Sequence, residues 1–214
     1  MCGIIGIVGK SSVNQTIYDG LTVLQHRGQE SAGIVAVDDD GVAHAAREMG
    51  LVSEGFSEQA IGALRGSVAV GHTRYSTAGS SSIENAQPVL ARFRGGHIAL
   101  AHNGNLTNAT ELRRELEDQG SIFSSTMDSE VLVHRIAKSP AETPEGKLAD
   151  ALQGVEGAYC VAIVIGDTLV AARDPHGWRP LALGRLGTAT VVASETCALD
   201  IVGATFVLEV EPGE

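Results

Sequence analysis

Apolar and polar positions alternate along the chain in a pattern that predicts many short strands and fewer amphipathic helices. The apolar run Ile4-Ile5-Gly6-Ile7-Val8 is typical of a buried strand. Residues 13–25 follow it, with Ile17, Leu21 and Leu24 at helical spacing. Further strands are predicted at 33–37, 42–46, 68–72, 97–101, 159–165, 168–172, 181–184, 189–193 and 206–210, and further helices at 107–118, 128–137, 145–152 and 196–202.

The order of these elements indicates the fold class. Asp38-Asp39-Asp40-Gly41 separates two apolar runs and carries the Asp-Gly signal of a β-hairpin. Strands neighbour one another and helices come in groups, so the pattern predicts an α+β fold with mostly antiparallel sheets covered by helices. We interpret residues 1–214 as one domain. The closing Pro212-Gly213-Glu214 looks like an interrupted turn and predicts that more chain follows.

Composition narrows the classes of function. Apolar residues make up 43% of the 214 residues and supply a sizeable core, although aromatic residues are only 4%. The net charge of −11 disfavours nucleic acid or an anionic membrane surface as a partner. The sequence has neither a long apolar run nor a basic region followed by an apolar one, so no membrane span and no signal peptide are expected. The three widely spaced cysteines fit a reducing compartment, and a cytoplasmic location is expected.

Cys2 is the first candidate for chemistry. Cells commonly remove an initiator methionine that precedes a small residue, and Cys2 then carries a thiol and a free α-amine. The unperturbed pKa is about 8.5 for the thiol and about 7.7 to 8.0 for the amine. One residue can therefore supply both a nucleophile and a base near neutral pH. The strand that begins directly after Cys2 would hold this terminus in place, whereas the alternative is a small buried cysteine without chemistry.

Polar clusters interrupt the apolar pattern at 26–31, 71–77, 102–105 and 128–130. Attack of a thiolate on an amide creates an oxyanion, and the Asn103 side-chain amide with the Gly104 N–H would supply two donors to it. Arg74 matches the carboxylate of an amino-acid substrate by its bidentate geometry, and Asp128 matches the ammonium by charge. Each residue also has a structural interpretation: a turn at 103–104, an ion-paired arginine, and a helix cap at Asp128.

Together these motifs resemble the glutaminase domain of the amidophosphoribosyltransferase family, whose members open de novo purine synthesis. The resemblance extends from Cys2 to Glu214 with the motifs in the family's order. It implies a class II glutamine amidotransferase with the N-terminal-nucleophile hydrolase fold, a four-layer αββα sandwich of two mostly antiparallel sheets. The motifs are Cys2-Gly3-Ile4-Ile5-Gly6, His26-Arg27-Gly28-Gln29-Glu30-Ser31, Gly71-His72-Thr73-Arg74-Tyr75-Ser76-Thr77-Ala78-Gly79, His102-Asn103-Gly104-Asn105 and Asp128-Ser129-Glu130.

The resemblance also implies a role for each site residue. After removal of Met1, Cys2 forms a glutamyl thioester and its own amine acts as the base. A loop at 75–85 closes over the bound glutamine and keeps competing water away. The implied catalytic residues are Cys2, the oxyanion-hole pair Asn103 and Gly104, and Arg27 and Gly28, which order the surroundings of the nucleophile. The implied substrate-binding residues are Arg74 and Thr77 at the α-carboxylate of glutamine and Asp128 at its α-amino group.

Partners and cofactors follow from the same resemblance. The substrate is L-glutamine, and ammonia passes to a phosphoribosyltransferase domain that is absent from this chain, so this segment alone is expected at most to hydrolyse glutamine. No cofactor is expected here. Mg²⁺ serves the absent domain in full-length members, and some members hold an iron–sulfur cluster with ligands mostly beyond this segment. The parent enzyme is expected to be a homo-oligomer. No metal site is expected because no Cys or His pair has zinc-finger spacing.

Two other interpretations stay open. A glutaminase domain of the glucosamine-6-phosphate synthase type shares the cysteine and the Asn-Gly pair. It carries Arg-Gly-Tyr-Asp-Ser and Arg-Trp-Ala-Thr where this chain has Arg27-Gly28-Gln29-Glu30-Ser31 and Arg74-Tyr75-Ser76-Thr77, and these differences favour the first family. A non-catalytic binding or regulatory module of the same fold is the other alternative, although every chemically needed residue is present.

Overall fold

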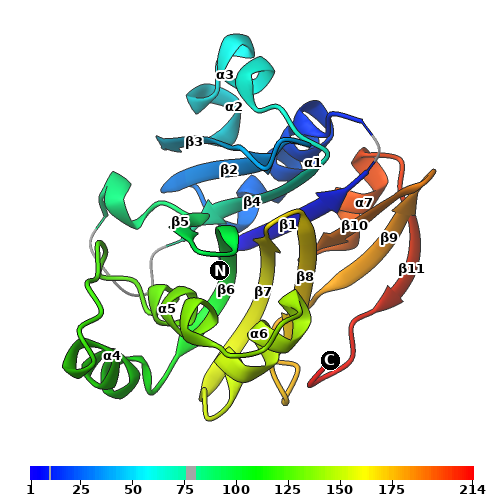
Figure 1. Ribbon diagram of the computed structural model, residues 1–214. Helices are drawn as coiled ribbons and strands as arrows, with labels where there is room; N and C mark the ends of the chain where they lie inside the picture. The colour runs from blue at the N-terminus through cyan, green and yellow to red at the C-terminus, as the bar shows by residue number, and fades with distance from the viewer. Residues whose placement is uncertain (10, 76–80) are drawn as a thin grey trace.

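Two antiparallel sheets stacked face to face form the centre of the molecule in the computed structural model, which describes residues 1–9, 11–75 and 81–214 (Figure 1). Within these ranges the larger sheet has seven strands in the order β11-β9-β10-β1-β4-β2-β3, and the smaller has four in the order β5-β6-β7-β8. All neighbouring strands pair antiparallel. The predicted α+β class is therefore confirmed.

The N-terminal strand lies in the middle of the larger sheet. β1 (Gly3–Val8) pairs with β10 (Ala189–Ala193) on one side and with β4 (Val68–Arg74) on the other. The other strands of this sheet are β2 (Ser31–Val37), β3 (Ala43–Met49), β9 (Ala182–Leu186) and β11 (Thr205–Glu209). The smaller sheet consists of β5 (Val89–Phe93), β6 (Gly96–Leu106), β7 (Gly157–Ile165) and β8 (Thr168–Arg173).

Helices cover the outer face of each sheet. The larger sheet carries α1 (Asn14–Leu24), α2 (Val52–Gly55), α3 (Glu58–Ala63) and α7 (Thr196–Ile201), as Figure 1 shows. The smaller sheet carries α5 (Glu130–Lys138) and α6 (Pro144–Leu152), with α4 (Ala109–Asp118) packed against α5. Two short 3₁₀ turns span Gln25–Arg27 and Ile83–Asn85.

The alternation of side chains along the central strands builds the layers. On β1, Ile5 and Ile7 join the cluster under α1, whereas Ile4 faces the smaller sheet. On β6, Ala99 and Ala101 fill the space between the sheets, while the intervening side chains pack under α5. Because successive strand residues point to opposite faces, each central strand contributes to two cores at once. The result is a four-layer αββα sandwich.

The structure extends and corrects several predicted elements. The strand predicted at 97–101 placed the polar residues 102–105 after its end. β6 in fact runs to Leu106, so these residues lie within the strand. The helix predicted at 128–137 begins at Glu130 and not at Asp128. β5, α2 and α3 were not predicted. β5 is only partly buried, and the two helices have four and six residues, so none of them produces a sustained apolar period.

The length and apolarity of the helices decide whether one of them could span a membrane. No helix in the part of the chain that the structure describes is both long and apolar enough to cross a bilayer.

Candidate active site

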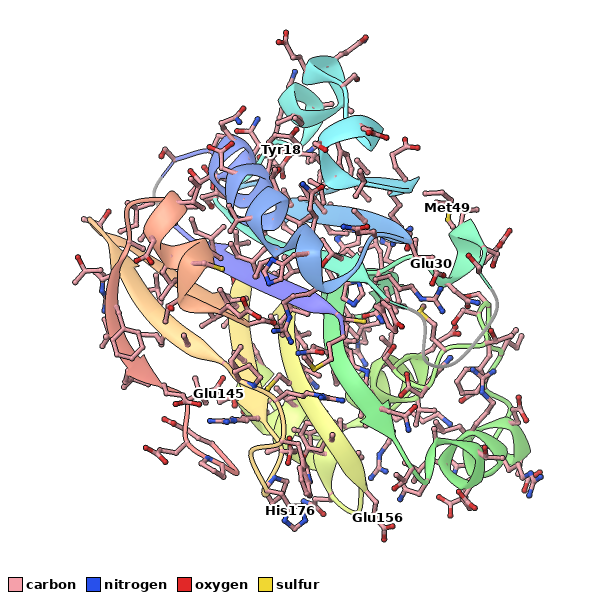
Figure 2. All side chains as sticks on the ribbon, turned by 180° about the vertical axis from the view of Figure 1, so that it is seen from behind. Tyr18, Glu30, Met49, Glu145, Glu156 and His176 are labelled. Carbon is pink, nitrogen blue, oxygen red and sulfur yellow. The ribbon has the colours of Figure 1, made fainter. Side chains whose placement is uncertain are left out.

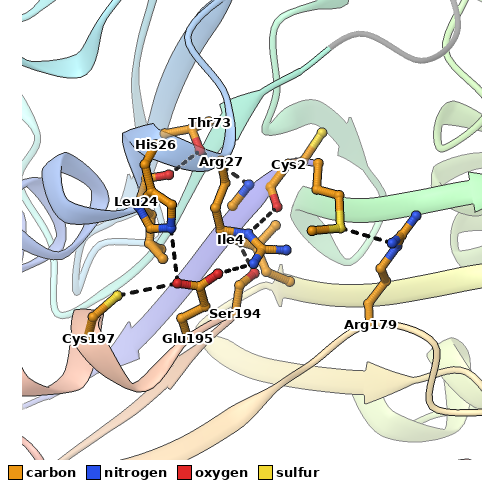
Figure 3. Close-up of polar contacts among 12 residues, drawn as sticks. Cys2, Ile4, Leu24, His26, Arg27, Thr73, Arg179, Ser194, Glu195 and Cys197 are labelled. Carbon is orange, nitrogen blue, oxygen red and sulfur yellow. Dashed lines mark hydrogen bonds and ion pairs between the residues drawn. The ribbon is translucent and has the colours of Figure 1, made fainter.

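The segment that carries Cys2 is held by side chains from three other parts of the chain (Figure 3). The carbonyl oxygen of Cys2 accepts a hydrogen bond of 2.8 Å from Nε of Arg27. The Gly3 N–H donates to Oγ1 of Thr73 at 3.2 Å, and the Ile4 N–H donates to Oγ of Ser194 at 3.0 Å. Three consecutive residues thus have fixed backbone groups, and the expectation that the strand ties down this terminus is confirmed.

Burial controls the chemistry of the Cys2 thiol. Its Sγ donates to the carbonyl oxygen of Tyr75 at 3.6 Å. Desolvation raises the pKa of the thiol above its usual value, and the contact with Tyr75 and the positive N-terminus only partly offset it. Burial also lowers the pKa of the N-terminal ammonium of Met1. At neutral pH the thiol is therefore protonated, and attack on a substrate requires a base close by.

Arg27 and Gly28 lie where the chain leaves the first 3₁₀ turn. The Arg27 side chain is only 4% exposed and forms an ion pair with Glu195. A Cβ at Gly28 would lie 2.6 Å from the carbonyl oxygen of Arg74 and 2.8 Å from the nitrogen of Tyr75. A residue without a side chain therefore lets these two backbone segments meet beside Cys2.

The strand register brings Asn103 to the same end of the sandwich as Cys2. Asn103 continues the β6 row of Ala99 and Ala101, which faces the larger sheet. His72 of β4, the register partner of Ile4, contacts the carbonyl oxygen of His102 at 2.9 Å through Nε2. Asn103 is the next residue along β6, and Cys2 precedes Ile4 by two residues, so both lie just beyond this contact.

Asn103 and Gly104 have the properties of an oxyanion-binding pair. The Asn103 side chain is buried, and its Nδ2 has no hydrogen-bond partner among the described residues. A buried donor without a partner costs free energy, which is recovered when an acceptor arrives. A Cβ at Gly104 would collide with the carbonyl group of Ala158 on the neighbouring strand β7. The close approach of these two backbones thus requires glycine.

Arg74 is buried at the end of β4 and forms an ion pair with Glu30. Glu30 directly precedes β2 and lies near Met49, the last residue of β3 (Figure 2). The register that pairs Gly3 with Thr73 sets the backbone of Cys2 opposite that of Arg74. Burial raises the pKa of the Cys2 thiol, and the positive charge of Arg74 lowers it by a smaller amount.

Asp128 lies just before α5, beside the C-terminal end of β6. Its two carboxylate oxygens accept from the backbone N–H groups of Leu106 at 2.8 Å and Ser129 at 2.7 Å. Burial alone would raise the pKa of this carboxyl. The neighbouring His102, whose Nδ1 lies 3.7 Å away, and the two backbone donors outweigh that effect and leave the pKa below its usual value. Asp128 is therefore an ionised, largely buried carboxylate at neutral pH, as an ammonium-binding group needs to be.

The structure thus brings Cys2, Arg27, Gly28 and Arg74 to one end of the larger sheet, and Asn103 and Gly104 to the facing end of β6. Thr77 lies outside the described residues, as does most of the first half of the predicted loop 75–85. The described ranges contain no group of three or more His, Cys, Asp or Glu side chains that could hold a metal ion.

The sequence did not reveal the supporting role of four residues around this site, although Glu30 and Thr73 lie within the quoted motifs. Glu195 and Glu30 pair with Arg27 and Arg74, and Thr73 and Ser194 bind the backbone after Cys2. The signal for the two carboxylates was indirect: an arginine in a buried position needs a counter-charge, but the sequence does not say which one.

Comparisons with known proteins agree with this geometry. Residues 72–200 match a family described as a glutamine amidotransferase domain. The chain is 51% identical over 214 residues to the chloroplastic amidophosphoribosyltransferase 2 of Arabidopsis thaliana and 49% identical to the amidophosphoribosyltransferase of Bacillus subtilis. Both alignments cover the whole chain but only 38% and 45% of those proteins, so the chain spans less than half the length of these relatives.

A solved structure gives the same result. The glutamine phosphoribosylpyrophosphate amidotransferase of B. subtilis, complexed with ADP and GMP, superposes with a TM-score of 0.91 at 48% identity. The match covers 99% of this chain and 46% of that one. It confirms the predicted stack of two antiparallel sheets between helical layers.

Proposed function

Because the chain belongs to the glutamine amidotransferase family, we propose that it hydrolyses the side-chain amide of L-glutamine through a thioester on Cys2. One observation supports this most strongly. The anchored segment of Cys2 and the Asn103 amide, whose nitrogen has no partner among the described residues, lie at the same end of two stacked sheets. A nucleophile and a donor for the developing oxyanion are the two groups that acyl transfer needs within reach of one carbonyl.

The reaction begins when Met1 has been removed and the amine of Cys2 is free. This amine takes the proton of the half-buried thiol, and the thiolate sulfur attacks the side-chain carbonyl carbon of glutamine. The negative charge that develops on the carbonyl oxygen is stabilised by the Asn103 amide and the Gly104 N–H. The C–N bond then breaks, the amine returns the proton to the leaving nitrogen, and ammonia departs. Water attacks the thioester and releases glutamate.

Two charged groups hold the rest of the substrate. Arg74 binds the α-carboxylate and Asp128 the α-ammonium, with Thr77 assisting at the carboxylate. Support for Asp128 comes from its lowered pKa, which keeps the carboxylate ionised at the pH where the substrate amine is protonated. Support for Arg74 comes from its burial beside Cys2, where the low dielectric strengthens contact with a carboxylate.

For the whole protein we propose the activity that the names of its relatives carry. Ammonia released at Cys2 passes to a phosphoribosyltransferase domain and reacts there with phosphoribosyl pyrophosphate to give 5-phosphoribosylamine, in de novo purine synthesis. The relatives at about half identity are amidophosphoribosyltransferases, which disfavours the glucosamine-6-phosphate synthase alternative. The reading frame beyond Glu214 tests this proposal, and a phosphate-binding loop of the phosphoribosyltransferase type is the expected finding.

The glutaminase reaction itself is tested by ammonia release from glutamine. Replacement of Cys2 by alanine removes the thiol while keeping a small residue after Met1, and ammonia release should vanish. A second variant with a lysine inserted between Met1 and Cys2 retains the methionine, which mass spectrometry verifies, and it should also be inactive although folded. Undiminished release by either variant would refute the mechanism. A non-catalytic module would bind glutamine in calorimetry without releasing any ammonia.

A further inference from the structure

Glu195 lies directly before α7, and its carboxylate contacts three side chains (Figure 3). Arg27 forms an ion pair with Oε1. Nε2 of His26 lies 3.0 Å from Oε2, and the thiol of Cys197 lies 3.5 Å from the same oxygen. Of these three neighbours Arg27 is the one that also contacts Cys2, since its Nε donates to the carbonyl oxygen of Cys2.

The ion pair is needed because Arg27 is buried. A guanidinium with 4% of its side chain exposed is costly without a counter-charge, and Glu195 supplies that charge from a position that is 32% exposed. Burial alone would raise the pKa of the Glu195 carboxyl. Arg27 and the other neighbours hold it below its usual value, so the carboxylate is ionised at neutral pH.

Ser194, the residue before Glu195, is hydrogen-bonded to the backbone of Ile4 near the start of β1. Ser194 accepts the Ile4 N–H on its hydroxyl and donates its own N–H to the Ile4 carbonyl at 2.9 Å. Residues 194 and 195 therefore hold the beginning of β1 from one side, Ser194 directly and Glu195 through Arg27.

We propose that Glu195 is a positioning residue for the nucleophile, acting through Arg27 on the carbonyl group of Cys2; this rests on the proposed role of Cys2. A first residue with a free amine has few covalent constraints, and its backbone carbonyl is the group that an outside contact can fix. With the guanidinium locked by Glu195, the thiol and amine of Cys2 keep one orientation toward the scissile amide. Glu195 itself does not touch the substrate.

The test replaces Glu195 by glutamine, which keeps the size and one acceptor oxygen but removes the charge. We expect kcat for ammonia release to fall about tenfold, the effect of losing one charge-assisted contact on the barrier. KM for glutamine should change by less than about twofold, because Arg74 and Asp128 are untouched. Glu195→Asp keeps the charge and should recover part of kcat. In the double variant that combines Glu195→Gln with Arg27→Ala, activity should equal that of Arg27→Ala alone. Both substitutions interrupt the same series of contacts from Glu195 through Arg27 to Cys2.

A second measurement follows the anchoring without using catalysis. The rate at which iodoacetamide alkylates Cys2, followed by peptide mass spectrometry, should rise at least about threefold in Glu195→Gln as the segment loosens. The matched control is Glu209→Gln. Glu209 lines the same pocket of about 420 Å³ as Glu195 but pairs with Arg173, so neither kcat nor Cys2 alkylation should change.

The outcomes separate the two proposals. If the native protein releases no ammonia, the proposed function fails, and faster alkylation in Glu195→Gln would then show only that Glu195 anchors the segment of Cys2. If the native protein is active and Glu195→Gln matches it in kcat and in Cys2 alkylation, the positioning role is wrong while the glutaminase proposal stands. Additive losses in the double variant, or equal losses in kcat and in affinity for glutamine, would also overturn it.

Discussion

Gly28 shows how a single missing side chain can shape the site. Its backbone lies against that of Arg74 and Tyr75, so an alanine here must push apart two segments that frame Cys2. We expect Gly28→Ala to lower the free energy of unfolding by about 1–3 kcal/mol, the usual cost of overpacking, and to lower kcat as well. Urea unfolding followed by circular dichroism measures the first effect and ammonia release the second.

Gly62 provides the matched control for this change. It lies within α3, and apart from its chain neighbours and the backbone of its own helix no described atom lies within 4 Å of an added Cβ. Gly62→Ala should therefore raise stability by about 0.5–1 kcal/mol, because alanine loses less entropy in a helix. Equal urea midpoints for native protein and Gly28→Ala would contradict the close approach at Gly28.

Asp128 allows a direct test of substrate recognition at the residue scale. Asp128→Asn removes the charge and turns one acceptor oxygen into a donor, so it should raise KM for glutamine about tenfold or more, the value of a hydrogen bond to a charged group. One of the two backbone contacts to Leu106 and Ser129 weakens, but the far-ultraviolet circular dichroism should stay native. An unchanged Michaelis constant would count against the ammonium-binding role.

The sequence suggested candidate site residues but not the residues that support them. Cys2, Asn103 and Asp128 were predicted because the expected reaction needs a nucleophile, an oxyanion donor and an anionic group. Glu195 was not identified as a partner of Arg27, from which it is separated by 168 residues, and Glu30 lies 44 residues from Arg74. No local pattern encodes such pairs, because only the stacking and register of the strands decide which carboxylate reaches which guanidinium.

At the scale of elements, prediction succeeded where a segment is apolar on a regular period. β1 and β7 lie close to their predicted limits for this reason. It failed in the second half of β6, where polar side chains occupy strand positions and interrupt the apolar pattern. It also failed at β5, α2 and α3, which are short or half-exposed and owe their form to tertiary contacts more than to local propensity.

Glu130 connects one helix to the loop before it. As the first residue of α5, its carboxylate accepts from the backbone N–H and the hydroxyl of both Ser124 and Ser125. Burial alone would raise the pKa of the Glu130 carboxyl, but these donors hold it below its usual value. A lowered folded-state pKa means that the carboxylate stabilises the fold above the unfolded value. That stability is lost as pH falls through the lower, folded value.

Glu130→Gln should therefore destabilise the protein at pH 7 by about 1.5–3 kcal/mol, the value of hydrogen bonds to a charged group. The difference from the native protein should shrink as pH falls below 4.5, since the native carboxyl becomes neutral as well. Urea unfolding at a series of pH values measures it. The exposed Glu142, changed to Gln, should have no effect at any pH. A difference for Glu130→Gln that does not vary with pH would show that charge is not the cause.

At the scale of the whole molecule, the site is a consequence of stacking two sheets. β1 and β4 of the larger sheet bring Cys2 and Arg74, and β6 of the smaller sheet brings Asn103 and Gly104. The apolar layer between the sheets, which includes Ile4, Val70, Ala101 and Cys160, ends at this site. The position of Cys2 relative to Asn103 and Gly104 is therefore set by the packing of that layer, and no single loop or helix determines it.

This dependence predicts that the two sheets unfold as one unit. Ile4 is fully buried between them, and Ile4→Ala should lower the free energy of unfolding by about 2–5 kcal/mol. Cys160, in the same layer, is a built-in probe because burial raises the pKa of its thiol to about 12 and keeps it unreactive in the folded state. Circular dichroism and pulsed alkylation of Cys160 should give coincident urea transitions, both shifted by Ile4→Ala.

Ile122, which is 87% exposed, is the control, and Ile122→Ala should move neither transition. If the smaller sheet separated first, Cys160 would become alkylated at a urea concentration where the circular dichroism of the larger sheet is still native. The alignment of Asn103 with Cys2 would then depend on a weak contact between two independent units, and ammonia release would be lost along with Cys160 protection. Coincident loss of circular dichroism, Cys160 protection and activity is the result that one cooperative sandwich requires.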